Sequence, residues 1–236
     1  MRTLVIIPAY NEEGNLGTLL QKLSHHNVDV IVINDCSTDR TVKVCIEHNV
    51  KYIDLPNNLG IGGAVQTGYQ FAAKNNYDIA IQIDGDGQHN PEYIPHVIKP
   101  LVEDQADMVI GSRYITMEGF QSSFVRRVGI KHFSRLIKLL LNQVVTDPTS
   151  GFRACNKSVI ELFSKTYPTD FPEPETIVTL IRTKQRVVEV PVVMNSREMG
   201  ISSINKAKAA YYMVKVSLAI LIDYFRVTNK EIVEST

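Results

Sequence analysis

The sequence has no excess of charge of either sign and few cysteines. Its 25 Lys and Arg residues equal its 25 Asp and Glu residues, which disfavours a nucleic-acid-binding protein because such proteins present a basic surface. The three cysteines, Cys36, Cys45 and Cys155, form no CxxC pair. The sequence therefore predicts neither a zinc site nor a disulfide framework, and we expect core or near-core thiols of the kind found in a reducing cytoplasm.

Long hydrophobic runs are also missing. Residues 209–222 are mostly apolar but contain Lys215, and they fall short of the roughly 20 residues that cross a bilayer. The first residues hold only a short apolar run that ends at Pro8, without a cleavage-site pattern, so no signal peptide is expected. We therefore predict neither a transmembrane helix nor a secretory leader.

Two common nucleotide-binding loops are absent. No GxxxxGK[ST] phosphate loop occurs anywhere in the chain. The glycine-rich segment 58–64 comes after the third predicted strand, and Val65 stands where a dinucleotide fingerprint needs its last glycine. A nicotinamide-dependent enzyme is therefore disfavoured.

The pattern that is present indicates an α/β fold. Of the 236 residues, 44% are hydrophobic and 21% are charged, as in a globular protein with a sizeable core. Short apolar runs alternate with segments of helical period, which favours a mostly parallel, Rossmann-like sheet flanked by helices. We predict strands at 3–7, 28–33, 51–55, 78–83 and 107–110, and helices at 12–25, 38–48, 60–75 and 91–103.

The second half of the chain adds two helices of different character. Residues 124–142 have five basic and no acidic side chains, so this basic amphipathic helix either packs with a solvated basic face or meets anionic lipid or phosphate. The apolar segment 209–222 predicts a C-terminal helix. That helix either packs on the domain, lies in a membrane interface or docks on a membrane partner.

The strongest chemical signal is DGDGQH at residues 84–89, directly after a predicted strand. Asp84 and Asp86, separated by one small residue at a strand end, are suited to hold a hard divalent cation that bridges two phosphates of a nucleotide. A turn rich in Asp and Gly has the same composition. An Asp-x-Asp phosphatase is disfavoured because Gln88 stands where that class has Thr or Val.

Two further segments end neighbouring strands. PAYNE (residues 8–12) follows the first predicted strand and NDCSTD (residues 34–39) follows the second. Because parallel strands end at the same edge of a sheet, both segments are expected on one rim, where an aromatic ring and carboxylates can hold a base and a ribose. Their polar residues are also typical of turns and helix caps.

Together these segments resemble a known family. PAYNE, NDCSTDRT, NNLGIGGAVQTG, DGDGQHNPE, GSRY and DPTSGFRA occur in this order, as in family 2 inverting glycosyltransferases of GT-A fold. The sequence is most similar to the dolichyl- and polyprenyl-phosphate sugar transferases within that family. It departs at Asn34, where the family commonly has a second aspartate, and it stops where many relatives continue into transmembrane helices.

The resemblance implies roles for individual residues. Asp84 is expected near the sugar and diphosphate, while Asp86 and Gln88 are expected to bind Mg²⁺ or Mn²⁺. Arginines suit phosphate oxygens because the guanidinium is a planar fork of donors. The expected nucleoside ligands are Pro8, Tyr10, Glu12 and Asp35, and the expected phosphate ligands are Arg113, Arg126 or Arg127, Arg153 and Arg197.

The implied mechanism also raises the question of a general base. A phosphate monoester is already largely ionised near neutral pH, since its second pKa is about 6, so a lipid phosphate needs little help from a base. The candidates are Asp147, Glu173 and Glu175. The other interpretation is that Asp147 begins a turn and that FPEPE (residues 171–175) is a proline-spaced loop.

The resulting hypothesis is an enzyme that moves a sugar from a UDP- or GDP-sugar to a polyprenyl phosphate at the cytoplasmic face of a membrane. We expect a catalytic domain at 1–203, with a donor half at about 1–113 and an acceptor half at about 114–203, then a C-terminal helix and tail at 204–236. We expect the protein to bind a membrane surface or a small membrane partner, and not nucleic acid. The sequence leaves both a monomer and a homo-oligomer possible. The alternatives are a transferase that extends a glycan hydroxyl, a sugar-nucleotide pyrophosphorylase and a catalytically silent nucleotide-sugar-binding protein.

Overall fold

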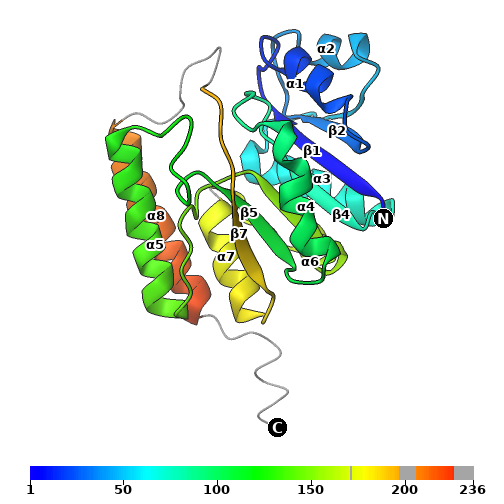
Figure 1. Cartoon of the computed structure of the whole chain (residues 1–236). Helices are drawn as coiled ribbons and strands as arrows, with labels where there is room; N and C mark the ends of the chain where they lie inside the picture. The colour runs from blue at the N-terminus through cyan, green and yellow to red at the C-terminus, as the bar shows by residue number, and fades with distance from the viewer. Residues whose placement is uncertain (171, 197–205, 226–236) are drawn as a thin grey trace.

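A seven-stranded sheet forms the centre of the computed structural model, which describes residues 1–170, 172–196 and 206–225 (Figure 1). The strand order is β3-β2-β1-β4-β6-β5-β7, and only β6 runs antiparallel to its neighbours. The predicted Rossmann-like, mostly parallel sheet is confirmed. The strands are β1 (Thr3–Ala9), β2 (Asp29–Asn34), β3 (Lys51–Asp54), β4 (Ile79–Gln82), β5 (Met108–Ser112), β6 (Arg153–Asn156) and β7 (Val187–Pro191).

Helices cover both faces of the sheet. One apolar core joins one face to α1 (Leu16–Leu23), α2 (Thr41–Glu47) and α4 (Ile94–Val102). A second core joins the other face to five helices that include the predicted basic and C-terminal helices. These five are α3 (Gly60–Lys74), α5 (Phe124–Leu141), α6 (Lys157–Lys165), α7 (Pro172–Arg182) and α8 (Lys206–Phe225).

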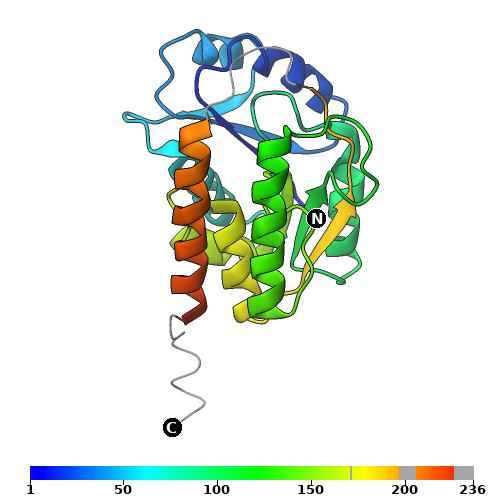
Figure 2. The same ribbon diagram turned by 90° about the vertical axis from the view of Figure 1, so that its left-hand side faces the viewer.

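The helices α5 and α8 lie side by side and cover α7 (Figures 1 and 2). The buried ring of Phe133 on α5 meets Tyr212 of α8 edge to face, at 5.4 Å between centroids. His132 and Ser217 share a hydrogen bond of 2.9 Å between the same helices. The apolar inner sides of both helices therefore anchor them to the domain.

The helix starts and the cysteine positions show how local sequence becomes structure. Asn90 caps the turn at Pro91–Tyr93, accepting from the backbone N–H of Glu92. Cys45 and Cys155 are buried, and Cys36 is partly exposed. A proline-spaced loop is the other interpretation of residues 171–175, but residues 172–175 form the start of α7, whose first turn carries the prolines where missing N–H groups cost little. No helix among residues 1–170, 172–196 and 206–225 has the length and apolar character of a membrane span.

Candidate active site

The ends of β1 and β2 are joined by a set of backbone-to-side-chain hydrogen bonds. The loop after β1 donates three successive N–H groups, from Asn11, Glu12 and Glu13, to the segment after β2. In return Thr38 donates its N–H to the Asn11 side chain at 2.8 Å. The two segments thus lie on one rim, as the strand order requires. The acceptors of the first three bonds are Ser37 Oγ, Thr41 Oγ1 and Asp39 Oδ2, at 2.9, 2.9 and 3.0 Å.

The DGD turn lies against this rim. A Cβ added to Gly85 would stand 3.2 Å from the carbonyl oxygen of Pro8 and 3.3 Å from the side chain of Glu12. Gly87 has a φ of +74°, a left-handed conformation that favours glycine. Asp86 Oδ1 accepts the N–H of Gln88 at 3.0 Å, which closes the turn. The glycines therefore let the backbone bring both carboxylates beside the end of β1.

His89 lies beside the turn and binds the backbone of its first residue, Asp84. It is buried, stacks on Phe152 with 5.2 Å between ring centroids, and accepts the N–H of Asp84 on Nδ1 at 3.0 Å. Because Nδ1 accepts a hydrogen bond, the ring proton is on Nε2, which stands 3.7 Å from Asp84 Oδ2. His89 is thus a neighbour of the DGD carboxylates on their inner side.

Gly151 lies directly against the Asp84 carboxylate. A Cβ at this position would stand 2.9 Å from Asp84 Oδ2, 3.0 Å from Oδ1 and 3.2 Å from Gln82 Nε2. The Gln82 amide stands 3.4 Å from Asp84 Oδ1. The segment 146–152, which overlaps the DPTSGFRA motif from Asp147 onward, therefore fixes how far the Asp84 carboxylate extends into the rim.

We predict that Gly151→Ala lowers sugar transfer by about 10- to 100-fold, since the added methyl pushes Asp84 out of place and a shift of about 1 Å at a reacting centre has effects of this size. Initial rates with saturating donor measure the loss. Gly129→Ala on α5 is the matched control, because a Cβ there meets nothing closer than 3.8 Å. Equal activity of the two variants would contradict a positional role for residue 151.

Asp35 and its neighbours form a bonded group at the end of β2. Asp35 is buried and accepts the N–H of Leu59 at 2.7 Å, which ties the rim to the start of α3. Asn34 donates its side-chain amide to Asp54 Oδ1 at 2.6 Å. A carboxylate at position 34 would face Asp54 as a like charge. Position 34, where the family commonly has a second aspartate, therefore carries an amide that binds the carboxylate of Asp54 on β3.

Arg113 and Asp147 form a buried, two-pronged ion pair. Arg113 Nε donates to Asp147 Oδ2 at 2.7 Å and Nη2 donates to Oδ1 at 2.8 Å. Asp147 has no exposed surface, and Arg113 is 5% exposed. Paired hydrogen bonds to Asp147 raise the pKa of Arg113, although burial opposes the rise. Asp147 is thus enclosed as the partner of Arg113, and its expected role as a general base stays a prediction.

Arg153 is enclosed as well. Its guanidinium donates to the carbonyl oxygens of Ser150 and Pro148 and to the hydroxyl of Thr176, at 2.7, 3.1 and 2.7 Å. The residue is 1% exposed. Arg153 therefore holds the backbone of residues 148–150 against α7, and its expected contact with a phosphate stays a prediction.

Glu173 and Glu175 face different surroundings although both lie in the first turn of α7. Burial raises the pKa of Glu173. The positive charge of Arg153 lowers this pKa, and the negative charge of Asp84 raises it. Burial raises the pKa of Glu175 to about 7, and the charge of Asp223 on α8 adds to the rise. Asp84 of the DGD turn is thus among the charges that act on Glu173, and Asp223 of α8 is among those that act on Glu175. The catalytic role expected for Glu175 stays a prediction.

We predict that Glu175→Gln stabilises the fold more at pH 8 than at pH 5, when the free energy of unfolding of the variant is compared with that of the parent chain at the same pH. The pKa of Glu175 is raised from its ordinary 4.5 to about 7. Its contribution to stability is therefore fully present below about pH 4.5 and is lost as the pH rises through about 7. The glutamine lacks this loss, which is on the order of 2 kcal/mol, or several degrees in Tm.

Thermal unfolding of both proteins at several pH values measures this difference. Glu161→Gln, an exposed position on α6, is the control and should leave the pH dependence unchanged. A Glu175→Gln difference that stays constant from pH 5 to pH 8 would show that the carboxyl titrates at its ordinary pKa.

The remaining predicted ligands are spread over three places. Pro8 is buried at the end of β1, while Tyr10 beyond it is 51% exposed and open to a planar ligand. Arg126 is exposed and Arg127 is half-buried at the start of α5, where the charge of Arg126 acts on Glu173. Arg197 and the rest of segment 197–205 lie outside the described residues.

The oxygen donors of the DGD turn fit a divalent cation in part. Asp84, Asp86 and the Gln88 amide bring hard oxygen ligands onto one tight turn, the donor type that Mg²⁺ and Mn²⁺ prefer. Among residues 1–170, 172–196 and 206–225, no three His, Cys, Asp or Glu side chains form a closed metal cage. These oxygen donors are therefore suited to a cation that takes its other ligands from a diphosphate.

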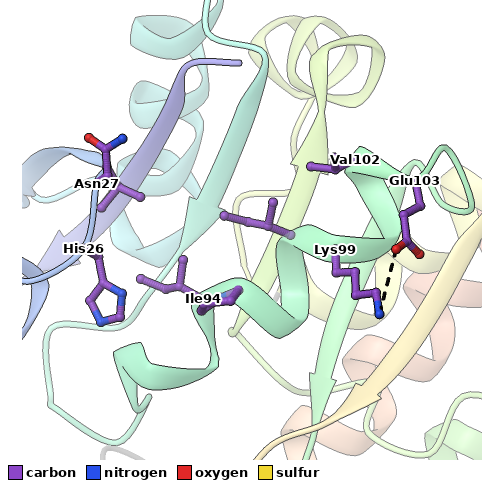
Figure 3. A pocket seen from close by; sticks show the side chains of 9 residues that line it. His26, Asn27, Ile94, Lys99, Val102 and Glu103 are labelled. Atoms are coloured by element: carbon purple, nitrogen blue, oxygen red, sulfur yellow. Dashed lines mark ion pairs between the residues drawn. The ribbon is translucent and has the colours of Figure 1, made fainter.

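A separate hollow of about 390 Å³ lies between α4 and the segment that joins α1 to β2 (Figure 3). Its floor is apolar, with Val28, Ile94 and Ile98, and an ion pair between Lys99 and Glu103 stands at one side. None of the residues of the DGD turn or of the β1 and β2 rim lines it. The candidate active site is thus the polar rim and not this hollow.

The sheet and its rim define a class, the GT-A type of α/β fold. A crystal structure of glucosyl-3-phosphoglycerate synthase from Mycobacterium tuberculosis, in complex with Mn²⁺, UDP-glucose and phosphoglyceric acid, superposes with a TM-score of 0.74 at 18% identity, covering 97% of this chain and 81% of that one. A family model described as Glycosyl transferase family 2 matches residues 4–163. The chain belongs to this family and is a glycosyltransferase.

Curated relatives narrow the class further. The chain is 34% identical, over 80% of its length and 83% of the relative's, to a UDP-N-acetylglucosamine–dolichyl-phosphate N-acetylglucosaminyltransferase of Methanococcus voltae. It is 29% identical, over 92% of its length and 86% of the relative's, to a polyprenol monophosphomannose synthase of Mycolicibacterium smegmatis. The resemblance to polyprenyl-phosphate sugar transferases, stated from the motifs, is confirmed.

Proposed function

We propose that this glycosyltransferase moves a sugar from a UDP- or GDP-sugar to a polyprenyl phosphate with inversion at the anomeric carbon. The observation that carries the proposal is the placement of the DGD turn against the joined ends of β1 and β2. This places acids and an exposed tyrosine on one rim, next to the buried Arg113. Relatives named for dolichyl phosphate and polyprenol support the acceptor class.

The donor side of the site is formed by residues 1–113 in this proposal. Tyr10 stacks on the base, while Pro8, Glu12 and Asp35 line the nucleoside pocket. Asp84 faces the sugar and the diphosphate from its position against Gly151. The GT-A neighbour with bound UDP-glucose supports a nucleotide-sugar donor, and single contacts in such a pocket decide between bases and sugars.

Asp86 and Gln88 would hold Mg²⁺ or Mn²⁺ in the same proposal. Bound there, the cation would neutralise charge on the departing nucleoside diphosphate. The chain's own contribution is to keep the two oxygen donors on one turn, through the bond from Gln88 N to Asp86, and to shield the inner side of the turn with His89. The GT-A neighbour with Mn²⁺ supports a divalent requirement.

The acceptor side is formed by residues from about 114 to 203, and Arg113 lies at its boundary with the donor side. A phosphate monoester is already largely ionised at neutral pH, so its oxygen attacks the anomeric carbon without a strong base. Arg113 and Arg127 orient this phosphate with their guanidinium donors, and Arg197 is proposed for the diphosphate. A single displacement from the face opposite to the leaving group inverts the configuration.

A lipid acceptor also requires a membrane, and we propose that α5 and α8 meet its cytoplasmic face. Most of the basic side chains of α5, among them Lys131 and Arg135, are exposed. An apolar stripe runs along the neighbouring α8. Basic side chains beside exposed apolar ones are typical of helices that bind anionic lipid. The stripe, named the α8 stripe below, consists of Tyr211, Val214, Leu218, Ile222 and Phe225, each at least 56% exposed.

A second acceptor class has one specific observation in its favour. Burial raises the pKa of Glu173, and Asp84 acts on it, so this carboxyl has the surroundings of a general base. A sugar-hydroxyl acceptor would need such a base. The second candidate is therefore a transferase that extends a glycan, with Glu173 in place of the enclosed Asp147.

Incubation of the purified protein with Mg²⁺ or Mn²⁺, a polyprenyl phosphate and labelled UDP- or GDP-sugars tests the proposal. We expect label to enter the organic phase with one donor and only in the presence of metal. Metal-dependent donor hydrolysis with an empty organic phase would favour the glycan acceptor, and activity would then be lost in Glu173→Gln. Absence of both reactions would contradict the proposed function.

A further inference from the structure

The Glu189 carboxylate on the edge strand β7 holds the start of segment 146–152. Its Oε2 accepts the backbone N–H of Thr146 at 2.6 Å and its Oε1 accepts that of Asp147 at 2.8 Å. Glu189 pairs with Ile110 of β5 in the sheet, so its side chain reaches the segment from a fixed strand. Both oxygens of one partly buried carboxylate are thus used on two successive peptides.

The peptide that Glu189 holds carries the partner of Arg113. The Asp147 carboxylate has no exposed surface and accepts from Arg113 Nε and Nη2 at 2.7 and 2.8 Å. A hydrogen bond of 2.6 Å between Ser112 and Thr146 joins the same segment to the end of β5. Because the backbone of Asp147 is fixed, its side chain has little freedom to move the guanidinium.

We propose that Glu189 is a positioning residue for the transfer reaction, which orients the Arg113 guanidinium through the backbone and carboxylate of Asp147. This inference rests on the proposed role of Arg113 at the phosphate. Glu189 lies outside all six motifs that carry the family resemblance, so no motif pointed to it. If Glu189 only stabilised β7, its replacement would leave the Arg113 guanidinium unchanged. A measurement on Arg113 therefore distinguishes the two roles.

The two N–H groups need an acceptor wherever water is excluded, since buried donors without partners are costly. A glutamine at 189 keeps the shape but offers one acceptor oxygen in place of two. It therefore frees one of the two peptides and leaves the strand intact. Glu189→Gln is thus a narrow change that loosens Asp147 without emptying the site.

The experiment combines kinetics with a direct view of the guanidinium. We expect Glu189→Gln to raise the KM for the polyprenyl phosphate or lower kcat by about tenfold, with the KM for the donor nearly unchanged. In an Arg113→Lys background, which loses the two-pronged pairing but keeps the charge, the same change should cost less than twofold. Glu161→Gln on α6 is the control and should leave all constants unchanged.

The nitrogen-15 NMR signal of the Arg113 Nε–H provides a measurement that does not depend on activity. We expect it to shift and to exchange faster with water in Glu189→Gln, while the Nε–H signal of Arg153 keeps its position. An unchanged Arg113 signal, or full additivity with Arg113→Lys, would overturn the proposal. If the parent protein transfers no sugar to polyprenyl phosphate, the proposed function fails, and the NMR result still decides whether Glu189 orients Arg113.

Discussion

Replacement of Asp86 by alanine is expected to lower metal-dependent sugar transfer at least about 100-fold, the size of effect seen when one group that stabilises developing charge is removed. Asp86 is 6% exposed, and its Oδ1 closes the turn by accepting from Gln88 N. The alanine therefore removes a hard oxygen ligand and loosens the turn that places the second one. Initial rates over a titration of Mn²⁺ measure both effects.

Glu92→Ala is the matched control for this prediction. Its carboxylate is 77% exposed in the same DGDGQHNPE motif, and the helix cap needs only its backbone N–H. We expect Glu92→Ala to keep activity within twofold. Binding of Mn²⁺ in the presence of UDP, followed by the electron paramagnetic resonance of the free ion, separates loss of metal from loss of fold. Transfer by Asp86→Ala within tenfold of the parent would place the metal elsewhere.

The first half of the fold could be predicted because the sequence signal for each of its strands is local. The five predicted strands correspond to β1 to β5, where each apolar run is followed by a segment of helical period. The rim followed from the same pattern, since parallel strands end on one edge. The hydrogen bonds between residues 11–13 and the segment after β2 are the consequence of that geometry.

The strand β6 was not predicted because nothing local marks it. It is four residues long, begins with Arg153, and pairs antiparallel with β4 and β5, more than 40 residues earlier in the chain. Its insertion places the 146–152 segment at the rim. The burial of Asp147 and Arg153 follows from this long-range pairing, and a sequence pattern shows a charged residue in a turn without showing what encloses it.

The two glutamates of FPEPE show how one local error changes a site. In a loop, Glu173 and Glu175 are equivalent candidates. In a helix, residues two apart are rotated by about 200° and face nearly opposite sides. Burial raises the pKa of both glutamates in α7, and the charge of Asp84 then acts on Glu173 while that of Asp223 acts on Glu175. The proline spacing concealed the helix, because prolines are also accepted in a first helical turn.

Loss of the α8 stripe is expected to weaken binding to lipid vesicles by about 30- to 100-fold. Leu218 and Ile222 are 56% and 58% exposed, and burial of the exposed part of each side chain contributes about 1 kcal/mol or slightly more. We predict this loss for Leu218→Ser/Ile222→Ser in flotation with phosphatidylcholine vesicles that contain phosphatidylglycerol. Val102→Ser on α4, 54% exposed on the other face of the sheet, is the control and should bind like the parent.

The basic side chains of α5 provide the second half of this prediction. Lys131→Gln/Arg135→Gln removes two exposed charges, each worth about 1 kcal/mol at an anionic surface. We therefore expect roughly 30-fold weaker binding to vesicles with phosphatidylglycerol, little change with phosphatidylcholine alone, and the same loss for the parent at high salt. If both double variants float like the parent, α5 and α8 do not face lipid. A change from dimer to monomer in Leu218→Ser/Ile222→Ser would instead identify the α8 stripe as a contact between copies of the chain.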